Sequence, residues 1–140
     1  MAEAFLNKKA SEKFEAFSAG SEPTESVHPL SIDAMHKFDI DISEFKTKQI
    51  DQFKNEEFDF VITLCDKAKE TCPCFPGKPV FAHWGFQDPV DFEGTEEEKR
   101  EFFYKIPRHV ETRINIFISL PMERQDKMAL EQQVRNIANI

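Results

Sequence analysis

Hydrophobic residues fall into three short runs that favour β-strands and four longer stretches that favour helices. The run at residues 58–64 is nearly unbroken, as in a strand that is buried on both faces of a sheet. Residues 14–19, closed by Gly20, and residues 79–84 are shorter runs of the same kind. We therefore expect three strands, where sheets of this kind usually have four or more.

Helical spacing of apolar residues occurs at residues 2–9, at residues 29–38, along a stripe that ends at Phe117, and at residues 128–137. The long stripe follows Thr95, which forms a capping box with Glu98 three residues later. Strands that alternate with helices indicate an α/β fold with a parallel sheet covered by helices on both faces.

Composition and charge narrow the class of protein. The 140 residues are sized for one domain, and the net charge of -8 argues against a nucleic-acid or anionic-membrane surface. No apolar run approaches the ~18 residues that would span a bilayer. The segment MAEAFLNKKASEKFEA is charged rather than an apolar leader, and three cysteines cannot all pair within one chain. We expect a cytoplasmic protein with reduced thiols, no nucleic-acid partner and no membrane partner.

All three cysteines lie within ten residues, and Cys65 directly follows the 58–64 strand. Ligands of open α/β sheets bind beyond the carboxyl ends of the strands, so Cys65 is a candidate for chemistry. Cys65 and Cys72 could form a disulfide only if the helical turn between them unwinds, because a disulfide needs Cα atoms about 4.4–6.8 Å apart. A buried cysteine is more commonly an inert small hydrophobe. With two cysteines flanking a polar loop, we favour a redox relay.

The residues alone leave two further candidate sites undecided. Cys65, Cys72, Cys74 and His83 could bind zinc, but their spacing fits no common zinc motif; Cys74 has no assigned role. Asp88 follows a predicted strand and could donate a proton to a leaving oxygen, or it could simply start a turn before Pro89.

The segment TLCDKAKETCPCFPG followed by HWGFQDP strongly resembles the arsenate reductases built on the low-molecular-weight tyrosine phosphatase fold. MAEAFLN, FSAGSEPTESVHPLSIDAM, FDIDIS, FPGKP and GTEEEKR are similar to stretches of that family in the same order, so the resemblance covers nearly the whole chain. The cysteine segment and HWGFQDP are its specific part, because plain phosphatases of this fold do not share them.

The resemblance implies a three-layer fold around a four-stranded parallel sheet of order 2-1-3-4, and reduction of arsenate to arsenite. A cysteine in a Cys-x5-Arg loop would attack arsenate, assisted by Asp88. Cys65 would then displace arsenite, and Cys72 would resolve the disulfide and present it to thioredoxin or a glutaredoxin-type reductant. Residues 1–118 would form the reductase domain and residues 119–140 its carboxyl-terminal helical extension.

This sequence departs from the family because it contains no Cys-x5-Arg. We expect the first strand and its loop to have preceded Met1, which predicts a truncated chain that is inactive alone. Strands that lose a neighbour leave amides and carbonyls unpaired, so we expect a rearranged sheet, low stability, or a dimer through the missing-strand edge.

Some members of the family hold potassium with residues matching Glu3 and Ser18. Lys48 replaces the family's aspartate there, so an ammonium group would take the place of the ion, and we expect no metal and no cofactor. Two alternatives to the reductase are a non-catalytic, redox-responsive thiol module and a low-molecular-weight tyrosine phosphatase. The phosphatase is disfavoured because the HWGFQDP loop lacks the tyrosines of those enzymes.

Overall fold

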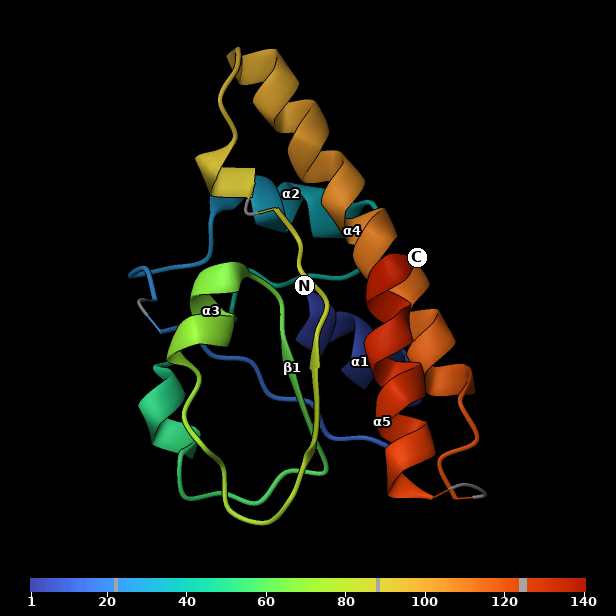
Figure 1. The fold of residues 1–140 in the computed structure, drawn as a ribbon. Coiled ribbons are helices and arrows are strands. Elements are labelled where there is room, and N and C mark those ends of the chain that lie inside the picture. Colours follow the sequence, from blue (N-terminus) through green and yellow to red (C-terminus); the bar gives the residue numbers. More distant parts are fainter. Residues whose placement is uncertain (22, 88, 124–125) are drawn as a thin grey trace.

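The computed structural model describes residues 1–21, 23–87, 89–123 and 126–140. Figure 1 shows the central strands with a long diagonal helix, α4, and a shorter helix, α5, running beside them. The helices are α1 (Ala2–Ala10), α2 (Pro29–His36), α3 (Asp66–Thr71), α4 (Glu96–Ser119) and α5 (Lys127–Asn136). The strands are β1 (Phe60–Thr63) and β2 (Val80–His83), and single 3-10 turns cover Ile50–Phe53, Pro89–Asp91 and Ile137–Asn139.

The sheet is parallel, as the alternation of strands and helices predicted. β1 pairs with β2 in a register that runs from Phe60 opposite Val80 to Thr63 opposite His83. Among the described residues the sheet has these two strands, so the four-stranded order 2-1-3-4 is not found there. The α/β class with a parallel sheet is confirmed.

The predicted strand at residues 14–19 is wrong. Its middle residue, Ala16, is bound by a side chain: Asn7 donates from Nδ2 to the Ala16 carbonyl at 3.1 Å and accepts from the Ala16 N–H at 2.9 Å. A strand needs a neighbouring ladder, and here the amide of Asn7 satisfies the backbone instead. The contact nearest to strand pairing is a single parallel bridge between Gly20 and Gln49.

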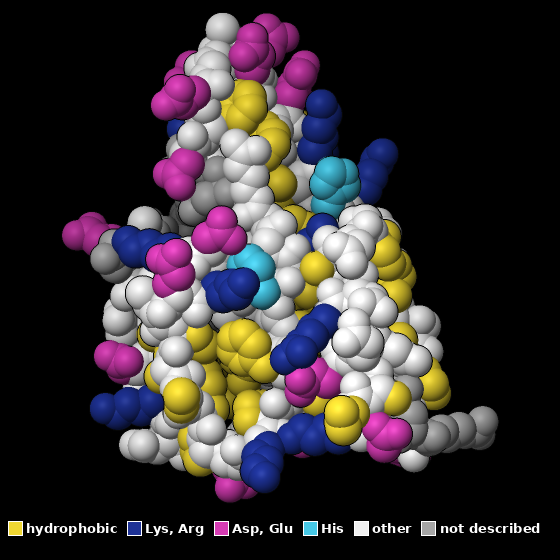
Figure 2. Space-filling model, in the orientation of Figure 1, with side chains coloured by type: hydrophobic (Ala, Val, Ile, Leu, Met, Phe, Trp, Pro, Cys, Tyr) yellow, Lys and Arg dark blue, Asp and Glu magenta, His cyan; other side chains and the backbone are white. Residues whose placement is uncertain are grey.

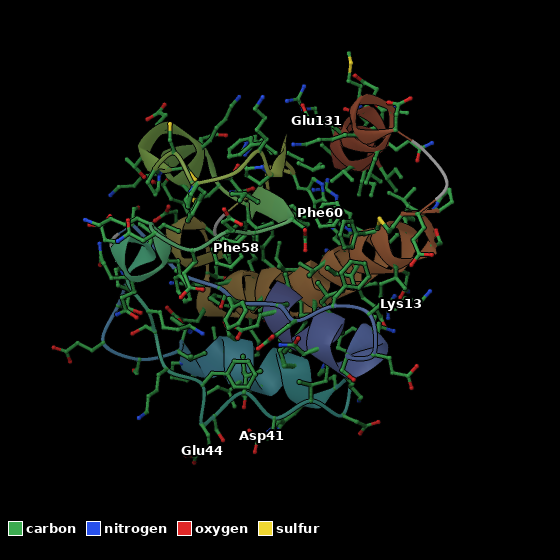
Figure 3. All side chains as sticks on the ribbon, turned by 90° about the horizontal axis from the view of Figure 1, so that it is seen from below. Lys13, Asp41, Glu44, Phe58, Phe60 and Glu131 are labelled. Atoms are coloured by element: carbon green, nitrogen blue, oxygen red, sulfur yellow. The ribbon has the colours of Figure 1, made fainter. Side chains whose placement is uncertain are left out.

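β1 is less buried than its apolar sequence predicted. Phe60, Val61 and Ile62 are half-buried and only Thr63 is fully buried, so burial on both faces is wrong for most of the strand. β2 covers one edge of β1, and the core lies on the face toward α4. Figure 3 shows α4 between the sheet and the pair of helices α1 and α2.

Two capped helices complete the core. The Thr95 hydroxyl accepts from the Glu98 N–H at 3.2 Å and so begins α4 as the capping pattern predicted. α5 packs along β2, where Arg135 donates from Nε to the Phe81 carbonyl at 3.0 Å. No helix within the described parts of the chain is long and apolar enough to cross a membrane.

Candidate active site

Cys65 lies at the junction of β1 and α3. It is the N-cap of α3, and its Sγ accepts a hydrogen bond from the Ala68 N–H at 3.4 Å. The side chain is half-buried and the thiol is free. Cys65 therefore lies at the carboxyl end of β1, where the sequence predicted it, with its sulfur bound to the first turn of α3.

Cys72 caps the other end of the same helix, and its thiol is also free and half-buried. Burial raises the pKa of Cys72, and the neighbouring Cys74 raises it further. The two thiols flank the six residues of α3, and a helix rises about 1.5 Å per residue, so their Cα atoms are separated by roughly 10 Å along the axis. A disulfide needs at most about 6.8 Å, and so α3 must unwind before Cys65 and Cys72 can join.

His83 ties this helix to the sheet, a role that the sequence did not reveal. Its Nδ1 lies 2.7 Å from the hydroxyl of Thr63 at the end of β1, and its Nε2 lies 3.0 Å from the carboxylate of Asp66 in α3. When Asp66 accepts the Nε2 proton, neutral His83 accepts from Thr63 through Nδ1. The ring thereby fixes the first turn of α3 against both strand ends.

The same region does not form a zinc site. Within the described residues, which include the three cysteines and His83, no three His, Cys, Asp or Glu side chains come close enough together to hold a metal ion. Cys74 is exposed and lies beyond the end of α3. The zinc alternative is therefore wrong.

The loop after β2 runs directly beside the end of β1. The N–H of Trp84 donates to the Thr63 carbonyl at 2.9 Å, and the N–H of Phe86 donates to the Leu64 carbonyl at 2.6 Å. Gly85 between them has a φ of +58°, a left-handed conformation that glycine adopts without strain. Asp88, the candidate proton donor, lies outside the described residues. Phe86, two residues before it in the sequence, contacts Leu64, the residue before Cys65.

The predicted cation position holds an ion pair. Lys48 Nζ lies 3.3 Å from Glu3 Oε1, and Ser18 donates its hydroxyl proton to the other carboxylate oxygen of Glu3. Glu3 and Lys48 border an open pocket of about 700 Å³ that Asn7 and Phe17 also line. The ammonium group of Lys48 thus lies against the carboxylate that the resemblance assigned to potassium.

Figure 2 shows where the surface around the thiols differs from the rest of this face. Hydrophobic side chains gather over the strands between α3 and α5, whereas acidic side chains cluster at the start of α4. Charged side chains lie over α3 itself, so the apolar patch is beside the helix that carries the candidate site.

The sequence of this chain matches a known protein family. Residues 1–133 match the family model described as low molecular weight phosphotyrosine protein phosphatase, and the chain belongs to this family. It is 40% identical over 117 residues to an arsenate reductase of Oceanobacillus iheyensis and 35% identical over 117 residues to an arsenate reductase of Bacillus subtilis. Each alignment covers 84% of this chain and 84% of the relative.

Solved structures agree with the sequence relatives. The chain is similar to an arsenate reductase in its oxidized state, with a TM-score of 0.66, 28% identity, and coverage of 81% of this chain and 82% of the other. A reduced arsenate reductase gives a TM-score of 0.63 at 26% identity, covering 84% and 85%. These comparisons do not bear out the prediction that the chain is truncated at its amino terminus. Residues 1–140 still contain no Cys-x5-Arg sequence.

Proposed function

We propose that this chain is an arsenate reductase in which Cys65 and Cys72 form a thiol relay. The observation that carries the proposal is the pair of free, half-buried thiols at the two ends of α3. They occur in a chain whose relatives, at 35–40% identity, are named arsenate reductase. A helix of six residues that must open for the thiols to meet suits a transient disulfide better than a permanent one.

The reaction takes two electrons. Arsenate and two thiols give arsenite, one disulfide and one water, so the arsenic is reduced while two sulfurs are oxidised. In the scheme that the family resemblance implies, a nucleophilic thiol first forms a sulfur–arsenic bond. Cys65 then attacks that sulfur and arsenite leaves. Cys72 attacks the Cys65 sulfur in turn, the first thiol departs with a proton, and a Cys65–Cys72 disulfide remains.

The first thiol of this scheme is assigned to no residue here, because the sequence has no Cys-x5-Arg. Asp88 is the proposed donor of the proton that turns a departing arsenate oxygen into water. A dithiol reductant of the thioredoxin or glutaredoxin type would reduce the Cys65–Cys72 disulfide and complete the cycle.

The test is arsenate-dependent NADPH oxidation with thioredoxin and thioredoxin reductase. It compares the chain with a version that is extended by the in-frame codons upstream of Met1. Activity in either form supports the reductase, and activity in the extended form alone assigns the first thiol to the added segment. Absence of arsenate-dependent NADPH oxidation in both forms overturns the proposal and favours the redox-responsive thiol module.

Variants in the active form separate the proposed roles. Cys72→Ser is expected to allow at most one turnover, because the oxidised Cys65 cannot be passed on, while the matched variant Cys74→Ser retains turnover. Sustained turnover by Cys72→Ser contradicts the relay. Asp88→Asn is expected to slow arsenite formation and to leave thiol titration unchanged; an unaltered rate would make Asp88 a turn residue only.

A further inference from the structure

Arg113 reaches from α4 to two separate parts of the molecule. Its Nη1 donates to the Trp84 carbonyl at 2.5 Å, and its Nη2 donates to the carbonyls of Ala138 at 3.1 Å and Ile140 at 3.4 Å. The guanidinium carbon also lies 4.2 Å from the centre of the Phe86 ring. One side chain thus joins the end of the chain to the loop that follows β2.

That loop is held between Arg113 and the end of β1. Trp84 and Phe86 donate their N–H groups to Thr63 and Leu64, the two residues before Cys65. The Trp84 carbonyl and the Phe86 ring are bound by Arg113. Residues 84–86 are therefore held from both sides, by Arg113 and by the end of β1.

α5 fixes the remaining part of Trp84. The indole Nε1 donates to the Val134 carbonyl at 3.0 Å, and the side chain is only 2% exposed. The backbone and the side chain of Trp84 are thus both bound by elements that lie beyond it in the sequence. The end of the chain from α5 onward contributes directly to the placement of this loop.

Arginine is the residue that this geometry requires. A planar guanidinium can donate in two directions while it stacks on a ring, whereas an ammonium group offers a point charge without the planar fork. Burial lowers the pKa of Arg113, and within the described structure its buried Nε has no hydrogen-bond partner. The guanidinium of Arg113 therefore loses part of its hydration in the folded protein, and carbonyl groups and an aromatic ring take the place of water.

We propose that Arg113 is a positioning residue for the thiol site, because its guanidinium holds residues 84–86 in place beside Leu64, the residue before Cys65. The inference rests on the proposed function for its effect on turnover. Its effect on the loop itself does not depend on that function. Loss of the planar fork should let the loop shift, and a displacement of about 1 Å in a positioned group can lower a rate by up to roughly a hundredfold.

The test compares Arg113→Lys with Arg135→Gln. Arg135 also joins a helix to β2, through the Phe81 carbonyl, and is a matched control because its contacts are with Phe81 and Glu131. In the form that turns over arsenate, Arg113→Lys is expected to lower kcat about tenfold with KM changed less than about twofold, whereas Arg135→Gln leaves kcat within about twofold. A normal kcat in Arg113→Lys, or an equal loss in Arg135→Gln, overturns the proposal.

A second readout does not need turnover. Trp84 is the only tryptophan of the chain, so acrylamide quenching of its fluorescence reports on this loop. In a Cys72→Ser, Cys74→Ser background, iodoacetamide reports on Cys65 alone. Arg113→Lys is expected to change the rate of Trp84 quenching and the rate of Cys65 alkylation about threefold or more, because the loop is displaced. Unchanged rates overturn the positioning role.

The two failures can be told apart. If the unsubstituted protein never reduces arsenate, the proposed function fails, while quenching and alkylation still decide the role of Arg113. If Arg113→Lys does not fold by circular dichroism, Phe86→Leu takes its place, since it removes the stacked ring and retains an apolar side chain. That variant should shift both rates in the same direction, and unchanged rates count against the proposal.

Discussion

Cys72 and Cys74 are separated by one proline but lie in different surroundings. Cys72 is half-buried at the end of α3. Its pKa is raised mainly by burial and to a smaller extent by the nearby Cys74. Cys74 is exposed. Since a thiolate is the attacking form, we expect Cys72 to be a weaker nucleophile in the folded protein than after α3 has opened. The surroundings of this residue thus link its reactivity to the state of the helix.

The pH dependence of alkylation tests this difference. Variants that retain only Cys72 or only Cys74 should react with iodoacetamide along curves whose midpoint lies at higher pH for Cys72, and the two midpoints should converge in urea. A raised folded-state pKa favours the neutral thiol. Cys72 therefore adds stability below its unfolded pKa, and this contribution is lost as pH rises through the folded pKa. Coincident curves in the native protein would contradict the effect of burial.

At the scale of an element, α3 is short enough to open. Isolated helices shorter than about 12–15 residues are marginal in water, and α3 has six. Its supports are local: the Cys65 cap, the contact of Asp66 with His83, and a bond from the Thr71 hydroxyl to the Lys67 carbonyl at 2.8 Å. Asp66 is 92% exposed, so its contact with His83 contributes at most about 1 kcal/mol.

Lys69→Gly and Lys69→Ala form a matched pair that tests whether α3 unwinds. Both remove the same exposed charge, but glycine destabilises a helix by about 1 kcal/mol relative to alanine. In a Cys74→Ser background, the equilibrium constant for Cys65–Cys72 disulfide formation in a glutathione buffer should be about fivefold larger for the glycine variant. Equal constants would mean that the thiols meet with α3 intact.

The sequence predicted elements well where their hydrogen bonds are local. The Thr95 cap and the apolar stripe after it placed α4, whose hydrogen bonds are local. The apolar run before Cys65 also placed β1, although its hydrogen bonds are to the distant strand β2. Residues 14–19 were not predictable in the same way, because the Asn7 side chain replaces the strand partner of Ala16. Periodicity reports which residues are apolar but not which distant polar group will satisfy the backbone.

The sequence also predicted only those parts of the candidate site that depend on residues close together in the chain. The spacing of Cys65 and Cys72 indicated a relay with a helical turn between them, and the structure has α3 at that place. The roles of these thiols and of Asp88 remain predictions. His83 and Arg113 could not be assigned from the sequence, since their partners are contacts across the fold: Arg113 binds carbonyls 25 to 29 residues away. The available signal was a lone arginine among the apolar positions of α4.

At the scale of the whole molecule, Phe117 joins the sheet to the helices. Its ring lies 5.2 Å from that of Phe14, 5.0 Å from that of Phe60 and 6.0 Å from that of Trp84, as measured between ring centres. The side chain is 1% exposed. The segment after α1, both strand regions and α4 therefore meet at one residue, so a small two-stranded sheet depends on this contact for its place in the core.

Phe117→Ala should therefore destabilise the entire fold rather than one element. Deleting a buried phenyl ring costs about 3–5 kcal/mol, a large part of the roughly 5–15 kcal/mol that stabilises a domain. Urea unfolding followed by circular dichroism and by Trp84 fluorescence should show one coincident transition at a much lower midpoint. Phe45→Ala is the control, because Phe45 is 38% exposed and its loss should change stability by about 0.5 kcal/mol or less. Separate transitions for the two probes would mean that the sheet and the helices unfold independently, and Phe117 would then not be the residue that joins them.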